Sequence, residues 1–197
     1  MAKQKGWGLS DKFKRLFSKR ERYTWYAPPG AVKDGNLGAA IQAAEAAGNN
    51  SLDLSGSTEL TGRGLAKLRD MRGLRGVKLA KATLADADLE ALAGLATLEW
   101  LDLSGIPING ACFTRLGALP ALEYLNLSHT KFCDQAVPGL RQHPALGVLD
   151  LSHTLVTEQG VETLASMQSL RVVRLKGSPV DVAILATIAR SEVEWDL

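Results

Sequence analysis

A unit of about 24 residues repeats along the chain, and this repeat constrains the fold more than any other feature. Each copy contains a three-residue motif with apolar first and third residues: Leu52-Asp53-Leu54, Val77-Lys78-Leu79, Leu101-Asp102-Leu103, Leu125-Asn126-Leu127, Leu149-Asp150-Leu151 and Val173-Arg174-Leu175. Successive motifs lie 25, 24, 24, 24 and 24 residues apart, and a partial copy, Trp195-Asp196-Leu197, follows after 22 residues. A fixed spacing of this kind predicts a stack of similar structural units.

The spacing inside one copy indicates a strand followed by a helix. We number each copy so that the two apolar motif residues are positions 4 and 6, which lie on one face of a short strand. Positions 16 and 19 are also apolar and have the spacing of one helical face. They are Leu89 and Leu92, Phe113 and Leu116, Val137 and Leu140, Val161 and Leu164, and Leu185 and Ile188. Stacking predicts a parallel sheet on one side and helices on the other.

The copy from Leu146 to Leu164 has the pattern L-x-x-L-x-L-S-x-T-x-V-T-x-x-G-V-x-x-L, which resembles the leucine-rich repeat. The 24-residue form is similar to the bacterial type and to the cysteine-containing, ribonuclease-inhibitor-like type. The resemblance covers residues 49–197, with about six full copies and a terminal strand. It implies an α/β solenoid, a right-handed horseshoe arc with the parallel sheet on its concave face and the helices on its convex face. It also implies a surface that binds another macromolecule.

Position 9 departs from the family pattern, which has Asn there. The residues at this position are Ala82, Ile106, Thr130, Thr154 and Ser178. A Thr or Ser hydroxyl can bond to the turn backbone as Asn does. Ala82 and Ile106 cannot, so we expect local irregularity in their two copies.

Two further segments precede the repeats. Residues 31–48 predict an N-terminal capping helix, because Leu37, Ile41 and Ala44 have helical spacing and Gly48 follows at the point where a helix would end. Residues 1–30 combine a basic amphipathic helix with an aromatic, proline-containing linker over residues 23–30.

Charge is distributed unevenly. Residues 1–22 contain eight basic and two acidic residues, whereas residues 82–197 contain seven basic and 14 acidic residues. The basic arm that we expect to make contacts comprises Lys12, Lys14, Arg15, Lys19 and Arg20, together with Phe13 and Phe17. Four hypotheses stay open for it: docking on a protein or on the solenoid itself, an anionic membrane surface, nucleic acid, or mitochondrial targeting.

The expected concave face carries two columns of side chains. Position 3 gives Trp100, Tyr124, Val148 and Val172, an exposed apolar stripe on the order of 15 Å long, which predicts a partner-binding site. The alternative is that these residues are isolated on the surface or are covered by the N-terminal segment. Position 5 gives Asp102, Asn126, Asp150 and Arg174, which either bind a basic segment of a partner or form an ordinary polar surface.

Nothing in the sequence predicts catalysis. His129 and His153 occupy equal repeat positions, so repetition explains their proximity, and His143 replaces a helix-side apolar residue. We expect no cofactor, no metal and no small-molecule substrate. Two cysteines and the lack of a secretory signal or an 18-residue apolar run predict a reducing compartment, cytoplasmic or inside an organelle.

The sequence therefore predicts a non-catalytic protein-protein interaction module, an adaptor or scaffold that binds its partner on the concave face. One alternative is a peripheral recruitment factor whose N-terminal helix binds an anionic membrane or nucleic acid. Another is a supernumerary or assembly subunit of a large complex, such as a membrane or mitochondrial complex.

Overall fold

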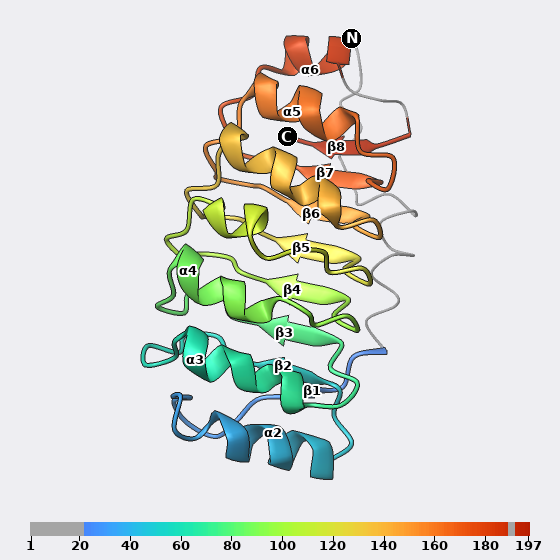
Figure 1. Cartoon of the computed structure of the whole chain (residues 1–197). Coiled ribbons are helices and arrows are strands. Elements are labelled where there is room, and N and C mark those ends of the chain that lie inside the picture. The colour runs from blue at the N-terminus through green and yellow to red at the C-terminus, as the bar shows by residue number, and fades with distance from the viewer. Residues whose placement is uncertain (1–21, 189–191) are drawn as a thin grey trace, which may run out of the picture.

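The structure, a computed structural model, describes residues 22–188 and 192–197. Eight short parallel strands form one sheet, and their order in the sheet is their order in the chain (Figure 1). They are β1 (Trp25–Tyr26), β2 (Ser51–Asp53), β3 (Gly76–Lys78), β4 (Trp100–Asp102), β5 (Tyr124–Asn126), β6 (Val148–Asp150), β7 (Val172–Arg174) and β8 (Glu194–Asp196).

Strands β2 to β8 contain the first two residues of each predicted motif, and the parallel alignment of these motifs is confirmed. Leu101 is the ladder partner of Leu125, and Leu125 is the partner of Leu149. Equal repeat positions therefore form straight columns across the sheet.

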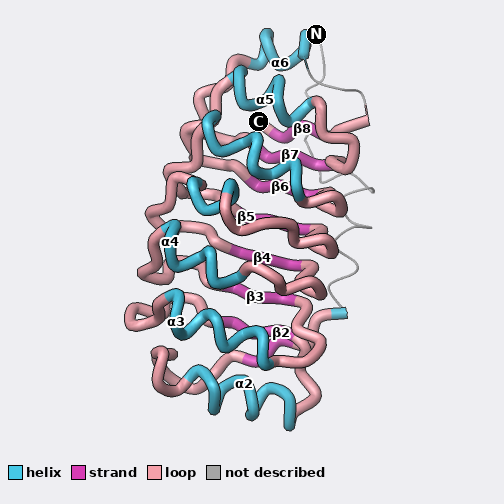
Figure 2. Tube along the Cα trace, viewed as in Figure 1, coloured by secondary structure: helices cyan, strands magenta, loops and turns pink. Residues whose placement is uncertain are grey.

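Helical segments stack in a layer beside the sheet (Figure 2). The α-helices are α2 (Leu37–Ala46), α3 (Gly62–Leu65), α4 (Asp86–Leu89), α5 (Glu158–Ala165) and α6 (Val182–Ile188). The 3-10 helices are η2 (Ala66–Asp70), η3 (Glu90–Leu92), η4 (Ala111–Thr114) and η5 (Asp134–Gln142). No helix among residues 22–188 and 192–197 has the length and apolar character that crossing a membrane requires.

The sequence predicted a similar helix in every copy, but η4 and η5 are 3-10 helices without an α-helical part. Pro138 lies inside η5 and removes a backbone donor that an α-helical turn would use. Helix η4 follows Gly110, whose φ of 91° is left-handed. The helical layer is therefore less regular than the sheet.

The core lies between the two layers. Leu101, Leu125 and Leu149 are fully buried at position 4. On the helical side, Phe113 and Phe132 are also fully buried, and their ring centroids lie 5.9 Å apart in an edge-to-face arrangement. The positions that the sequence pattern assigned to the core thus meet there.

Carboxylates connect consecutive helical segments. Asp134, which begins η5, accepts hydrogen bonds from the amide and the hydroxyl of Thr157, at 2.8 and 2.6 Å. Asp86 accepts bonds from the amides of Asn109, Gly110 and Cys112 at 3.0 to 3.1 Å. Each carboxylate satisfies free amides at the start of the next helical segment and so fixes the spacing of the units.

The turns after the strands use the predicted hydroxyl groups. The Thr130 hydroxyl donates to the Leu127 carbonyl at 2.7 Å, and Thr154 makes the same bond to Leu151. Ala82 donates its amide to Leu79 at 3.0 Å instead. Pairing of β3 with β4 and of β4 with β5 continues past Ala82 and Ile106, so the irregularity expected there is absent from the strands.

The segment before the repeats forms a further strand and helix, and the strand lies within residues 23–30, where the sequence predicts an extended aromatic linker. Trp25 and Tyr26 form β1, which pairs in parallel with β2. The predicted helix is present as α2, with Leu37, Ile41 and Ala44 buried. Sequence comparison among copies missed β1 because this strand has two residues and no leucine motif.

Candidate functional site

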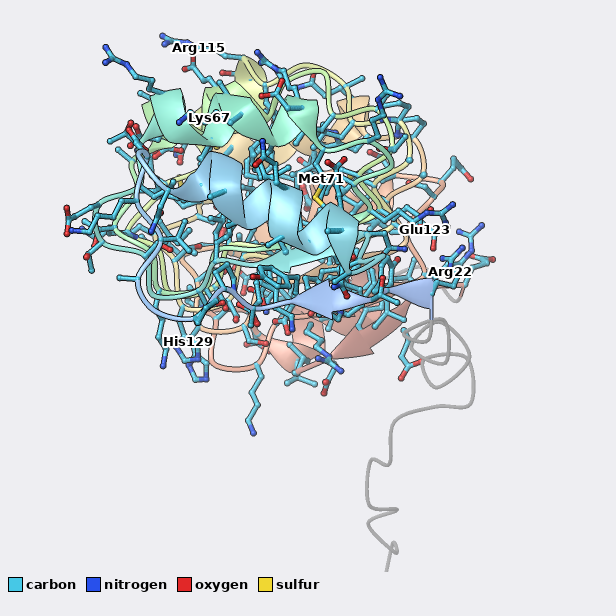
Figure 3. The ribbon with its side chains drawn as sticks, turned by 90° about the horizontal axis from the view of Figure 1, so that it is seen from below. Arg22, Lys67, Met71, Arg115, Glu123 and His129 are labelled. Atoms are coloured by element: carbon cyan, nitrogen blue, oxygen red, sulfur yellow. The ribbon has the colours of Figure 1, made fainter. Side chains whose placement is uncertain are left out.

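The sheet has one face against the helices and a second face directed away from them, which we call the sheet face. In Figure 3 the helices lie above the core and the strands below it. One column of the sheet face contains Trp25, Ser51, Gly76, Trp100, Tyr124, Val148, Val172 and Glu194. A second column contains Asp53, Lys78, Asp102, Asn126, Asp150, Arg174 and Asp196.

The predicted apolar stripe is a continuous column, but the prediction that solvent reaches it is wrong. Trp100 and Tyr124 are 9% and 8% exposed, and Val148 and Val172 are 4% and 1% exposed. These four residues and Tyr23 form a buried cluster separate from the main core, with Trp25 packed against it. The alternative that the N-terminal segment covers the stripe is correct at Trp100, where Tyr23 and Trp25 make the contact.

Four aromatic rings make up the first part of this cluster. Trp100 stacks on Tyr124 with a centroid distance of 3.7 Å. The Tyr23 ring meets Trp100 edge-on at 5.6 Å, and the Trp25 ring does so at 6.5 Å. A Cβ atom on Gly76 would lie 2.8 Å from the Trp25 ring, so the glycine makes room for the indole across β3.

A hollow opens between these rings. It has a volume of about 300 Å³ and is lined by Tyr23, Trp25, Lys78 and Trp100. The Lys78 ammonium lies 4.0 Å from the centroid of the Trp25 ring and 3.4 Å from the Asp53 carboxylate. This cation-π contact places a positive charge at the wall of an aromatic hollow.

A charged network fixes Arg22 and Tyr23 at the end of the strands. Arg22 forms ion pairs with Glu123 at 3.0 Å and with Glu99 at 3.4 Å, and Glu99 also pairs with Arg75 at 3.0 Å. Figure 3 shows Arg22 and Glu123 side by side at this end of the sheet. Burial, and next the charge of Glu99, raise the pKa of Tyr23 to about 12. The phenol therefore stays protonated and donates to Glu99 at 3.2 Å.

Sequence reasoning did not include Tyr23 and Trp25 in the site. The signal that could have found them is the cluster of three aromatic residues from Tyr23 to Tyr26, ahead of the capping helix. Exposed aromatic residues in a linker are unfavourable in water, so such a cluster indicates a contact with apolar surface.

Several residues of the second column of the sheet face stabilise the fold itself. Asp102 and Asn126 each accept the amide hydrogen of the residue two positions later, at 2.9 Å, which closes the turn after the strand. Asp150 makes the same bond and pairs with Arg174 at 3.4 Å, and it is only 8% exposed. Asp102, Asn126 and Arg174 are half-buried, and Arg174 also pairs with Asp196 at 3.8 Å.

The two histidines at equal repeat positions are neighbours, as their position in the repeat predicts. The rings of His129 and His153 stack with centroids 4.4 Å apart, and both side chains are exposed. Both residues have left-handed backbone, with φ of 58° and 56°. The described part of the chain contains no group of three or more His, Cys, Asp or Glu residues that could hold a metal ion.

The predicted basic arm, Lys12, Phe13, Lys14, Arg15, Phe17, Lys19 and Arg20, lies outside the described residues.

Comparison with known proteins gives a match to solved structures alone. The sequence matches no protein-family model and no curated protein. The chain is similar to an internalin from Listeria monocytogenes, with 19% sequence identity and a TM-score of 0.58. The similarity covers 79% of this chain and 49% of the internalin chain, so it spans less than half of that protein. This likeness and the eight-stranded parallel sheet with its helices support an α/β, leucine-rich-repeat-like fold.

Proposed function

We propose that the chain is a non-catalytic protein-interaction module that binds its partner on the sheet face. The observation that carries this proposal is the aromatic hollow of about 300 Å³ beside a column of half-buried polar side chains. Aromatic groups around a partly buried hollow are common anchor sites in protein interfaces. The leucine-rich-repeat-like fold supports the same class of function, since stacked units provide a long binding surface.

The chemistry of the surface favours one kind of partner segment. The hollow accepts an apolar or aromatic side chain between Trp25 and Trp100. Asp102 lies in the adjacent column and attracts basic residues, whereas Asp53 is already paired with Lys78. We therefore infer a protein segment in which an apolar anchor has basic neighbours.

A charge reversal on the sheet face tests this proposal. Asp102→Lys should abolish capture of the proteins that the unchanged chain binds, because it repels a basic segment. The repeat tolerates the new residue, since Lys78 occupies the same position in β3. The matched control is Glu162→Lys, the same charge change at an exposed residue of α5 on the helical side. Circular dichroism checks that both variants fold.

Mass spectrometry of the captured proteins gives the result. Loss of the same proteins with Asp102→Lys but not with Glu162→Lys supports the proposal. Retention with Asp102→Lys together with loss with Glu162→Lys contradicts it and assigns binding to the helical side.

More specifically, we propose that the chain acts as an adaptor or scaffold, or as a supernumerary or assembly subunit of a larger complex. Both cysteines are free, which supports a reducing compartment in the cytoplasm or inside an organelle.

The charge of residues 1–22 favours a second candidate function, a recruitment factor that binds an anionic membrane or nucleic acid. Binding of the full chain to anionic vesicles and to oligonucleotides across a salt series tests it. A response that does not weaken with salt contradicts this electrostatic candidate.

A further inference from the structure

Two side chains that precede β1 reach across the first strands toward the middle of the sheet. Trp25 belongs to β1, yet the Tyr23 ring packs on Trp100 of β4 and the Arg22 side chain reaches Glu123, which precedes β5. The side-chain amide of Asn50 also donates to the Arg22 carbonyl at 2.8 Å. At residue 22 the backbone therefore lies beside Asn50, just before β2, and the Arg22 side chain reaches from there to Glu123, which precedes β5.

The next part of the sheet face has an apolar column with a charged column beside it. Val148 and Val172 continue the column from Tyr124 and are buried. Asp150 and Asp196 lie in the adjacent column, and Arg174 lies between them and forms ion pairs with both. Residues 82–197 contain 14 acidic and seven basic residues, so this half of the molecule attracts positive charge.

Residues 1–21 have the complementary character. They contain seven basic and two acidic residues, with Phe13, Leu16 and Phe17 at helical spacing. A helix from residue 10 to residue 22 would be about 20 Å long. The four strands from β5 to β8 span about 14 Å, so a segment of this length covers them.

We propose that residues 1–21 bind in cis along the sheet face over β5 to β8, with Phe13 and Phe17 against Val148 and Val172. The basic side chains then lie near the acidic residues of the same half of the sheet. This inference rests on the proposed function in one respect: a partner that uses the second half of the sheet face has to displace the chain's own N-terminal segment.

Thiol labelling of the full chain tests the proposal. In Val172→Cys, the introduced thiol reports access to the sheet face, and mass spectrometry separates its labelling from that of Cys112 and Cys133. Adding Phe13→Glu with Phe17→Glu should make the introduced thiol react at least about tenfold faster, because the charged segment leaves the apolar column. Adding Phe13→Leu with Phe17→Leu, the matched control, should leave the rate slow.

Cys112 serves as an internal standard, since it is 1% exposed in the core and should react slowly in each variant. If Cys112 reacts quickly in the glutamate variant, the core of that variant has become accessible. The protein with its own N-terminal segment and Val172→Cys is then labelled at different salt concentrations instead. An increase from about 0.1 to about 0.5 M should then accelerate labelling of the introduced thiol alone, since salt screens the docking charges.

Equal labelling rates of the introduced thiol in the glutamate and leucine variants overturn the proposal. It is also overturned if labelling is slow in concentrated protein but becomes fast on dilution, because that result assigns the N-terminal segment to a second copy of the chain. Faster labelling of this thiol on addition of anionic vesicles alone, with equal rates in the two variants, also overturns it. Loss of partner capture by Asp102→Lys is a separate result, so the two proposals can fail independently.

Discussion

The fold should lose stability between pH 6.5 and pH 4 because of one buried imidazole, that of His143. This side chain is fully buried, and its ring meets Phe113 edge-on at 6.0 Å. Its Nδ1 atom accepts the Leu119 amide at 3.1 Å, and its Nε2 atom is buried without a hydrogen-bond partner in the described part of the chain. The neutral ring therefore carries its hydrogen on Nε2.

Protonation of His143 would put a second hydrogen on Nδ1, directly opposite the Leu119 amide, and a charge among apolar side chains. Burial accordingly lowers the pKa of His143 from 6.5 to about 4. In the unfolded chain the pKa returns to about 6.5.

The sign and the size of the effect follow from linkage. Because the folded pKa is depressed, the stability contribution is complete above pH 6.5 and is lost as the pH falls toward 4. The loss has a slope of about 1.4 kcal/mol per pH unit and totals about 3 kcal/mol. A small domain is stable by about 5–15 kcal/mol, so this loss is a substantial fraction.

Urea unfolding between pH 4 and pH 7.5 measures this contribution. His143→Asn keeps an acceptor for Leu119 but cannot titrate, so its curve should be flatter than that of the unchanged chain by about 3 kcal/mol over this range. His129→Asn is the matched control, because His129 is exposed and Asn tolerates its left-handed backbone. Parallel pH profiles for the unchanged chain and His143→Asn would refute the reasoning.

Three further substitutions test particular contacts. Gly76→Ala should lower the free energy of unfolding by about 1–3 kcal/mol and change tryptophan fluorescence, because the added Cβ would approach Trp25. Unchanged emission would argue against the position of this indole. Asp134→Ala should lower stability by about 1–2 kcal/mol through loss of two bonds to Thr157, and an unaffected urea midpoint would contradict this role. Lys81→Gly should raise stability by about 0.5–1 kcal/mol, because φ is 57° there; a lower Tm would show that the side chain contributes more than the strain costs.

The sheet could be predicted from the sequence because its register follows directly from the repeat. Equal spacing brings Leu101, Leu125 and Leu149 into one column, and the hydroxyl of Thr130 forms the predicted turn bond. These features depend on residues within one copy and its neighbour, which the pattern contains.

The exposure of the apolar stripe could not be predicted in the same way. Whether water reaches Trp100 depends on Tyr23 and Trp25, which both lie outside the repeat. Trp25 belongs to β1, a strand of only two residues, and Tyr23 precedes this strand. A repeat pattern specifies which side chains project from the sheet face, but it contains no information on what packs on that face.

The helical layer shows a second limit. The apolar spacing at Val137 and Leu140 is the same for an α-helix and for a 3-10 helix of this length, and both residues are buried in η5. The difference comes from Pro138, whose effect on the backbone a hydrophobic pattern does not register.

Carboxyl footprinting of the full chain with and without its captured partner tests the role of the sheet face most directly. Carbodiimide-activated labelling should fall at Asp53 and Asp102 when the partner binds, and it should stay constant at Glu162 on the helical side. Constant labelling at Asp53 and Asp102 with a decrease at Glu162 would contradict the assignment of the sheet face as the binding surface.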